Sequence, residues 1–227
     1  EKYAFVYQEL SEKLGIKKIE RIDAFDISHQ YMQQGVGSCV VFAESGPSKK
    51  DYRLFNISND IAGNDIASME NMISRRLKYY EDQKPDLILI DGGRAQLNFT
   101  NKILKNFGME KILVLGIAKG KGRVRATETI YTSKGVIEID PHSESFKVLS
   151  ELRDESHRFA ITASRKKIRK KNKYSALDSI KGIGPITKKA LLKKFKSLKG
   201  IKKASKDDLM TIKNINETMA SEIKQIL

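Results

Sequence analysis

The segment Arg21–His29 constrains the fold more than any other part of this 227-residue chain. Its apolar residues do not alternate strictly with polar ones, which is typical of a central β-strand that is buried on both faces. Asp26 lies in the middle of this apolar setting, where a lone carboxylate is costly unless a charged group compensates it. A divalent cation is the usual compensation when further acids converge on the same point. The rest of the sequence is therefore expected to supply those acids.

The segments that follow predict a mixed α/β sheet. Strands are predicted over 38–43, 51–57, 85–90 and 112–117, a hairpin over 129–139, and helices over 65–81, 94–107 and 143–168. Three antiparallel strands followed by helix, strand, helix and strand resemble the element order of the ribonuclease-H-like nuclease fold. We therefore expect a mixed five-stranded sheet with flanking helices. In that fold the first and fourth strands are neighbours, which would place Asp26 beside Asp91.

Asp91 is the second acid of the expected site. It ends a run of four apolar residues, and the glycines Gly92 and Gly93 follow it. This pattern fits an ordinary turn, but it also fits a carboxylate that substrate can approach closely. Paired with Asp26, it would form a site of hard oxygen ligands suited to Mg²⁺ or Mn²⁺.

Other residues could complete this site. His157 lies in a charged part of the last long predicted helix, where it could ligate metal, move a proton or simply be a hydrogen-bonded helix residue. His29 lies close in sequence to Asp26 and could contact a metal-binding side chain without binding the ion itself. Asp65 is either a helix N-cap or a further catalytic acid. Asp23 and Asp60 are expected to be surface or turn acids.

The charge of the chain is strongly asymmetric. Residues 158–227 hold 20 basic and 5 acidic residues, a surplus that accounts for the whole net charge of +15. Such a surplus indicates a polyanionic partner, with nucleic acid the first candidate. The glycine-containing loop with Lys119, Lys121, Arg123 and Arg125 is either a solvated loop or a second DNA contact, and Arg165 and Lys166 begin a basic segment that is expected to contact DNA.

The basic region carries a helix-hairpin-helix pattern. A predicted helix ends before Gly182-Ile-Gly184, and Pro185 starts the next helix at its favoured first position. The DNA-binding residues expected here are Gly182, Gly184, Thr187, Lys188 and Lys189. Backbone N–H groups at such a turn can bind a phosphate without reading base sequence. A second copy has Asn214 and Asn216 in place of the glycines, so its fold can survive while its phosphate contact is open.

The chain resembles the C-terminal half of the UvrC family. The matching segments are Phe25–His29, Asp51–Arg53, Asp86–Gly93, Gly116–Lys119, Arg153–Ile161 and Gly182–Gly184. The resemblance implies a helical lead-in over 1–20, a ribonuclease-H-like endonuclease domain over 21–164, a basic linker over 165–173 and a tandem helix-hairpin-helix domain over 174–227. It also implies metal-dependent incision 5′ of a lesion, with Asp26, Asp91 and His157 as the site and Asp65 as a further functional acid.

The resemblance also implies partners and limits. Damaged double-stranded DNA and UvrB are the expected partners, with UvrA upstream, and only one of the family's two incisions is expected from this segment. The one cysteine, Cys39, is expected to be a buried strand residue, and a single cysteine fits a reducing, cytoplasmic setting. No apolar run reaches the length of a membrane span, so no membrane contact is expected. Ala163-Ser164, Lys196, Asn214 and Asn216 depart from the family pattern. A non-catalytic DNA-binding scaffold and a junction resolvase of the same fold are the alternative functions.

Overall fold

The computed structural model describes residues 2–28, 35–58, 60–61, 63–80, 83–118 and 128–226, with the backbone alone at 167–176 and 178. The chain divides into two compact units, 1–164 and 165–227. The division coincides with the domain boundary expected after residue 164. Within the described residues no helix is both long enough and apolar enough to cross a membrane.

The first unit contains the strands and four of the helices. The strands are β1 (Ile22–Ser28), β2 (Val36–Ala43), β3 (Gly46–Pro47), β4 (Arg53–Asn56), β5 (Leu87–Asp91), β6 (Leu113–Ala118), β7 (Thr129–Thr132) and β8 (Gly135–Ile137). The helices are α1 (Lys2–Leu14), α2 (Asp65–Leu77), α3 (Arg94–Asn106) and α4 (Glu144–Asp178), with a 3₁₀ turn, η1, at Lys49–Asp51.

The strands form one mixed sheet in the order β3-β2-β1-β5-β6-β7-β8, with β4 paired to β2. β1, β5 and β6 run parallel at its centre, and the flanking pairs are antiparallel. The expectation of five strands was wrong, because the described part of the chain contributes eight strands to this sheet. The predicted hairpin extends the sheet, since β7 pairs with β6, and the two-residue β3 adds a further strand. The adjacency of the first and fourth expected strands is confirmed by the β1–β5 pairing.

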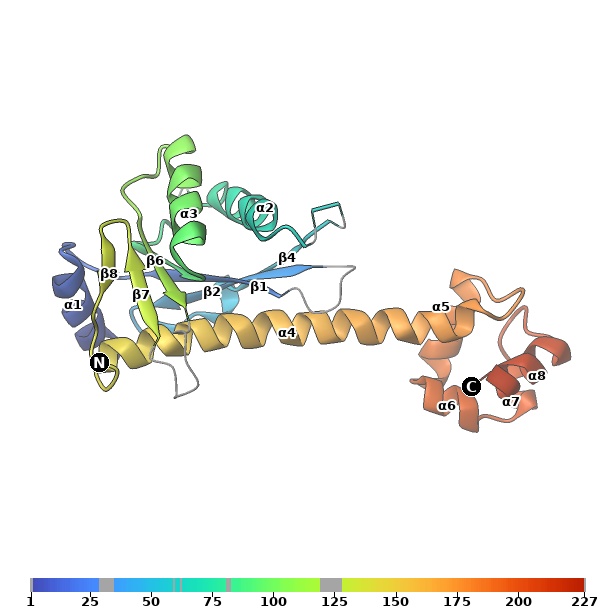
Figure 1. Cartoon of the computed structure of the whole chain (residues 1–227). Coiled ribbons are helices and arrows are strands. Elements are labelled where there is room, and N and C mark those ends of the chain that lie inside the picture. The colour runs from blue at the N-terminus through green and yellow to red at the C-terminus, as the bar shows by residue number, and fades with distance from the viewer. Residues whose placement is uncertain are drawn as a thin grey trace. The chain divides into compact units, whose positions relative to one another are not determined.

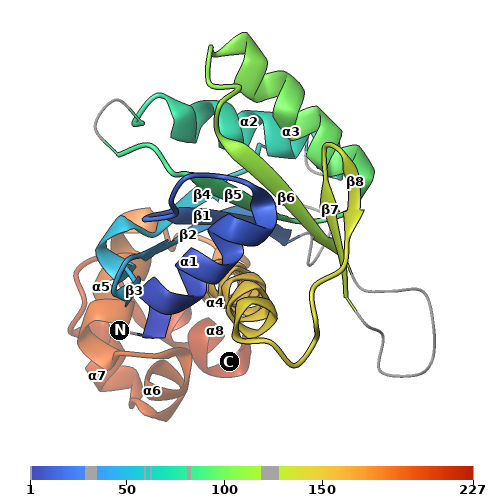
Figure 2. The same ribbon diagram turned by 90° about the vertical axis from the view of Figure 1, so that its left-hand side faces the viewer.

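Helices cover both faces of this sheet. α2 and α3 lie on one face, while α1 and the N-terminal part of α4 lie on the other (Figures 1 and 2). The Tyr3 ring of α1 packs edge-on against Phe42 of β2, and its hydroxyl donates to Glu151 of α4 at 3.1 Å. The central strands are therefore covered on both sides, which explains why their sequences are nearly continuous apolar runs.

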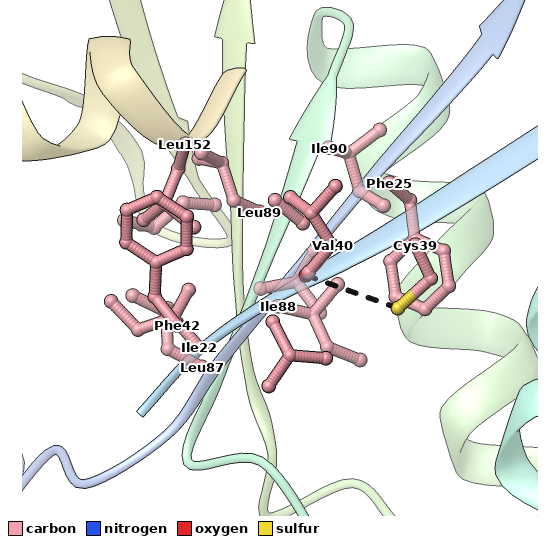
Figure 3. Packing of buried hydrophobic residues seen from close by; sticks show 14 of the residues in the cluster. Ile22, Phe25, Cys39, Val40, Phe42, Leu87, Ile88, Leu89, Ile90 and Leu152 are labelled. Atoms are coloured by element: carbon pink, nitrogen blue, oxygen red, sulfur yellow. Dashed lines mark hydrogen bonds between the residues drawn. The ribbon is translucent and has the colours of Figure 1, made fainter. Parts of the chain in front are cut away.

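The core follows the alternation of side chains along these strands. Phe42 and Leu89 face Leu152 of α4, whereas Phe25 and Cys39 face the opposite layer (Figure 3). All five side chains are at most 1% exposed. The prediction that Cys39 is a buried strand residue is confirmed.

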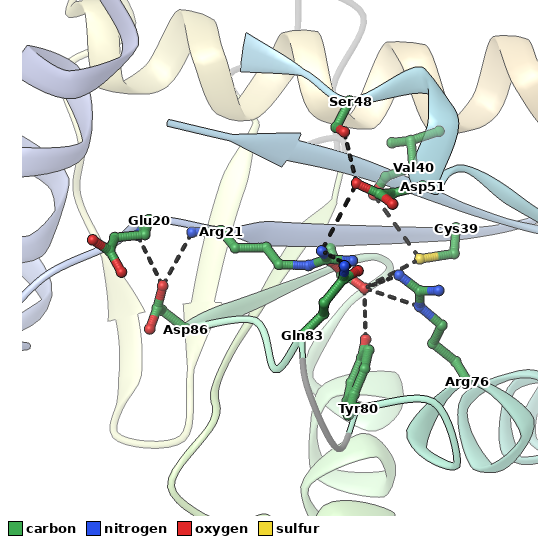
Figure 4. Close-up of polar contacts among 11 residues, drawn as sticks. Glu20, Arg21, Cys39, Val40, Ser48, Asp51, Arg76, Tyr80, Gln83 and Asp86 are labelled. Carbon is green, nitrogen blue, oxygen red and sulfur yellow. Dashed lines mark hydrogen bonds and ion pairs between the residues drawn. The ribbon is translucent and has the colours of Figure 1, made fainter. Parts of the chain in front are cut away.

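One prediction about β1 was wrong. Asp23, expected at the surface, is fully buried beneath α2. Its carboxylate accepts hydrogen bonds from the Arg76 guanidinium at 3.0 and 3.1 Å, from the Tyr80 hydroxyl at 2.7 Å and from Arg21 at 2.9 Å. Arg76 lies on α2 and Tyr80 follows it, and both side chains point toward the same carboxylate oxygen (Figure 4). Two guanidinium groups thus compensate a charge that would otherwise be very costly in this position.

The second unit contains two copies of one motif. Its helices are the end of α4, α5 (Pro185–Phe195), α6 (Leu198–Lys203), α7 (Lys206–Met210) and α8 (Glu217–Ile226). Core residues recur 32 positions apart: Leu177 with Leu209, Ile180 with Ile212, Ile183 with Ile215 and Leu191 with Ile223. The tandem repeat predicted from the sequence therefore has a shared apolar core of its own.

The basic segment 165–173 is helical. The expected helix end near residue 168 was wrong, because α4 continues to Asp178. Lysine, arginine, alanine and leucine are good helix formers, and the segment holds no glycine or proline before Gly182. High charge alone therefore does not end the helix here.

Candidate active site and nucleic-acid interface

Asp26 and Asp91 are brought together by the register of two parallel strands. Phe25 of β1 pairs with Ile90 of β5, so the next residue of each strand is an aspartate. Asp26 is 6% exposed, and Asp91, the last residue of β5, is half-buried. The carboxyl edge of parallel strands is where open α/β sheets place their ligands.

The turn after Asp91 depends on close backbone contacts. The Gly92 N–H donates to the Ile117 carbonyl of β6 at 2.9 Å. A Cβ on Gly116 would lie 2.8 Å from the Gly92 oxygen, so only glycine allows this approach. Gly93 then caps α3, and its N–H donates to Gln96 at 3.2 Å. The Asp-Gly-Gly segment is thus a tight turn, and that turn fixes the position of the Asp91 carboxylate.

His157 reaches the two aspartates from α4. Its Nδ1 lies 3.3 Å from Asp26 Oδ2, and its side chain is 54% exposed. A buried hydrogen bond ties this part of α4 to the sheet: the Ser38 hydroxyl donates to the Ser156 carbonyl at 2.9 Å. Ser38 is the residue of β2 that pairs with Asp26. One serine therefore connects the strand beside Asp26 to the helix residue that precedes His157.

These three side chains fit a divalent cation. Each offers one ligand atom, and the three atoms lie within 4.8 Å of one another. An ion with ligand distances of about 2.0–2.2 Å joins atoms that are at most about 4.4 Å apart, so a small inward adjustment of these side chains would bring all three atoms onto one ion. Two carboxylates and one imidazole suit Mn²⁺ at least as well as Mg²⁺, because imidazole favours transition metals. Asp23 and Asp26 are both buried in β1, but Asp23 has two arginines, whereas Asp26 faces a histidine and a second carboxylate.

The electrostatics of Asp26 agree with this fit. Burial raises the pKa of the Asp26 carboxyl, and the Asp91 carboxylate raises it further. His157 and the Ile27 backbone N–H lower the same pKa in part. The ionised pair of aspartates is therefore unfavourable by itself, and a bound cation would relieve the repulsion between them.

This raised pKa predicts that Asp26→Asn stabilises the metal-free protein. Because the folded-state pKa lies above the unfolded value, ionisation of Asp26 costs stability as the pH rises through those values, and the cost is complete above both. With a chelator at about pH 8, we expect Asp26→Asn to have a higher melting temperature than the wild-type chain. The gain should shrink at about pH 4, where the wild-type carboxyl gains its proton. A lower melting temperature at both pH values would contradict the assignment.

The Ser38 hydrogen bond predicts a role in positioning His157. Ser38→Ala removes the buried bond between sheet and helix, and we expect a stability loss of about 1 kcal/mol. We also expect several-fold weaker Mn²⁺ binding, since supporting contacts typically contribute about 10-fold or more to metal affinity. Ser156→Ala is the matched control, because the Ser156 hydroxyl bonds within its own helix to the Arg153 carbonyl. Equal Mn²⁺ affinities for the two variants, measured by calorimetric titration, would show that Ser38 has no such role.

The first hairpin of the second unit presents an open helix end. Gly182 adopts φ +91°, a left-handed conformation that glycine permits, and Gly184 precedes α5 without a side-chain cap. Lys181 and Lys189 are exposed around this turn. Backbone N–H groups at the start of α5 are thus directed outward beside positive charge, as a phosphate contact requires.

The sequence of this chain matches known families over both units. The profile of the UvrC RNase H endonuclease domain matches residues 11–161, which contain Asp26, Asp91 and His157. The chain belongs to this family. A tandem helix-hairpin-helix profile matches residues 174–227.

Full-length relatives of this UvrC-family chain are named UvrABC system protein C. The protein from Acinetobacter baumannii is 38% identical over 97% of this chain and 36% of its own length. The protein from Saccharophagus degradans is 39% identical over 97% of this chain and 37% of its own length. The chain therefore spans just over a third of the length of these relatives.

Similarity to solved structures is weak. A crystal structure of human ENDOV is 16% identical, with a TM-score of 0.33 over 47% of this chain and 48% of that chain. The catalytic domain of human Endonuclease V is 13% identical, with a TM-score of 0.38 over 67% of this chain and 84% of that chain.

The remaining predicted residues lie in several places. Asp65 is the exposed first residue of α2, and Asn64 is the N-cap, since its side chain accepts the Ala67 N–H at 3.1 Å. The N-cap interpretation of Asp65 was therefore wrong, and Asp65 also lies outside the three-residue cluster found among the described residues. Its catalytic role stays a prediction. His29, Lys119, Lys121, Arg123 and Arg125 lie outside the described residues.

The predicted DNA-binding side chains differ in exposure. Arg165 and Lys166 are exposed on α4, and Lys189 is exposed on α5. Thr187 and Lys188 are only 7% and 9% exposed. In the UvrC-family chain a phosphate at the first hairpin would therefore meet the backbone and Lys189 more directly than these two side chains.

Ser38 is a residue of the site that the sequence pattern alone does not identify. Serine is common in strands and loops, and its bond to Ser156 joins residues 118 positions apart. The sequence offers one indication of this role: Ser38 is a polar residue at the start of a predicted six-residue strand. Its position opposite Asp26 follows only when the antiparallel pairing of β1 and β2 is known.

Proposed function

We propose that this chain is the part of a metal-dependent DNA endonuclease that cuts 5′ of a lesion during nucleotide excision repair. The observation that carries the proposal is the convergence of Asp26, Asp91 and His157, whose ligand atoms lie within 4.8 Å of one another. Membership of the UvrC RNase H endonuclease domain family supports it, as does the name of the full-length relatives.

Asp26 and Asp91 would hold Mg²⁺ or Mn²⁺, and His157 would add a ring nitrogen. When bound, such an ion lowers the pKa of a coordinated water and neutralises phosphate oxygens. The strands fix the two carboxylates, since both follow paired residues of β1 and β5. The ring of His157 is half-exposed, so a DNA phosphate can approach the cluster from that side. The buried Asp26 carboxylate lies 3.3 Å from the Nδ1 atom of the His157 ring, and this contact orients the ring.

The C-terminal unit would hold duplex DNA without reading its sequence. Contacts to phosphates carry no base information, and the fifteen-charge surplus of residues 158–227 supplies the attraction. The named partners of this activity would be damaged DNA and UvrB, acting in the cytoplasm. The reduced, buried Cys39 is compatible with that compartment.

The test is a cleavage assay with the full chain. A lesion-containing duplex that already carries a nick 3′ of the lesion is incubated with Mg²⁺ or Mn²⁺, with and without UvrB. We expect an incision 5′ of the lesion that requires the metal ion. Preferential cutting of a four-way junction would instead support the resolvase alternative. DNA binding without cleavage under any of these conditions would support the scaffold alternative.

A further inference from the structure

The two hairpins of the C-terminal unit have the same backbone conformation, but the helices that follow them differ at their N-termini. Asn214 adopts φ +70°, close to the φ of +91° at Gly182, which occupies the matching position 32 residues earlier. The turn bond from the Ile183 N–H to the Ile180 carbonyl (3.2 Å) recurs between Ile215 and Ile212 (3.1 Å). The asparagine therefore preserves the fold of the second hairpin, because asparagine tolerates the left-handed region better than most residues.

The helix N-termini differ in what occupies them. The Asn216 side chain accepts the Met219 N–H of α8 at 2.9 Å, so it fills the position at which a phosphate oxygen would bind. Gly184, at the matching position, provides no such side chain. Glu217 follows Asn216 as the first residue of α8, where Pro185 begins α5. A carboxylate there satisfies the positive end of the helix and repels phosphate.

Glycine at position 184 is not required by the backbone. Its φ is −81°, and a Cβ there would have no heavy atom within 4 Å. A capping residue would thus fit and would stabilise α5 more than glycine does. What glycine provides is open access to the backbone N–H groups of the first turn.

Charge and apolar exposure point to the same hairpin. Residues 180–192 contain Lys181, Lys188 and Lys189 and no acid, whereas residues 212–224 contain two lysines and two glutamates. One of those lysines, Lys224, donates to the carbonyls of Lys202 and Ala204 in its own chain. Ile186, directly after Pro185, is 85% exposed, more than any other large apolar residue among those described. A deoxyribose could cover this side chain.

We infer that the two hairpins are unequal: the first contacts the DNA backbone, and the second is closed to phosphate by Asn216 and Glu217 and supports the first. The support is a direct contact, since a Cβ on Gly182 would lie 2.1 Å from Met219 Cε of α8. The inference rests on the proposed function, because it specifies which surface of the C-terminal unit meets DNA.

The test compares matched lysines in the full chain. Lys181 and Lys213 are both exposed and hold equivalent positions before the two turns. Binding of a short fluorescent duplex is measured by anisotropy over a range of NaCl concentrations. We expect Lys181→Gln to weaken binding about 3- to 10-fold and to reduce the salt slope by about 0.9, the value for one phosphate contact. Lys213→Gln should change neither quantity. Equal losses from the two variants would overturn the inference.

A second variant separates binding from folding. Gly184→Asn introduces at α5 the cap that Asn216 provides at α8, so we expect about 10-fold weaker DNA binding without a lower melting temperature. Wild-type affinity in this variant would also overturn the inference. If the wild-type chain fails to bind the duplex at all, the proposed function itself fails, and that outcome is distinct from equal contributions by two working hairpins.

Discussion

Replacing Asp91 by asparagine is expected to lower metal-dependent DNA cleavage by at least about 10³-fold, equivalent to ~4 kcal/mol in activation free energy. Asparagine has nearly the shape of aspartate, so the tight turn through Gly92 should persist. The variant loses one of the two carboxylates that face each other at the edge of the sheet, and with it half of the negative charge that would hold the ion. Single-turnover cleavage of the nicked lesion duplex measures this effect.

The matched control is Asp154→Asn, which removes a carboxylate from α4 three residues before His157. Asp154 is exposed and pairs with Arg153, so its loss should leave cleavage within about 2-fold of wild type. DNA affinity should be unchanged in Asp91→Asn, because the C-terminal unit supplies the backbone contacts. Retained cleavage in Asp91→Asn would show that the acid pair is not the reaction centre.

Asp23→Ala is expected to destabilise the chain by about 3–5 kcal/mol, the usual cost of removing one partner from a buried ion pair. The substitution leaves the Arg76 guanidinium, which is 5% exposed, without the carboxylate that accepts two of its hydrogen bonds. It also removes the acceptor of the Tyr80 hydroxyl. Urea unfolding followed by circular dichroism measures the loss.

A double variant tests the electrostatic origin of this loss. Asp23→Leu combined with Arg76→Met replaces the charged pair by apolar residues, and such replacements are often close to neutral. We expect the double variant to be more stable than Asp23→Ala. If it is less stable, the uncompensated Arg76 is not the cause, and the loss comes from packing or from Arg21 and Tyr80, which also lose their acceptor.

Asp26 and Asp91 could be predicted from the sequence because each lies in or at the end of a recognisable apolar strand. The two aspartates lie side by side as soon as β1 and β5 are neighbours in the sheet, which the expected fold provides. His157 was harder to assign. The charged residues around it favour a functional role, but they do not separate a metal ligand from an ordinary helix residue. The resemblance to the UvrC family is what implies that His157 belongs to the site.

The errors over Asp23 and α4 have different physical origins. Asp23 looks like a surface acid until Arg76, 53 positions later, is placed beside it by the packing of α2 on the sheet. The continuation of α4 beyond residue 168 depends on helix propensity outweighing charge repulsion. Whether the second hairpin contacts phosphate was left open by the sequence, because the answer depends on where the Asn216 side chain points. Of these outcomes, only the burial of Asp23 depends on a contact between distant parts of the sequence.

The most direct test of the central claim is a calorimetric Mn²⁺ titration of the full chain and of Asp26→Asn and Asp91→Asn. Asp26, Asp91 and His157 are expected to bind Mn²⁺ together, so the wild-type chain should bind it and each variant should bind at least about 10-fold more weakly. Wild-type Mn²⁺ affinity in both variants would contradict the assignment of these residues as a metal centre.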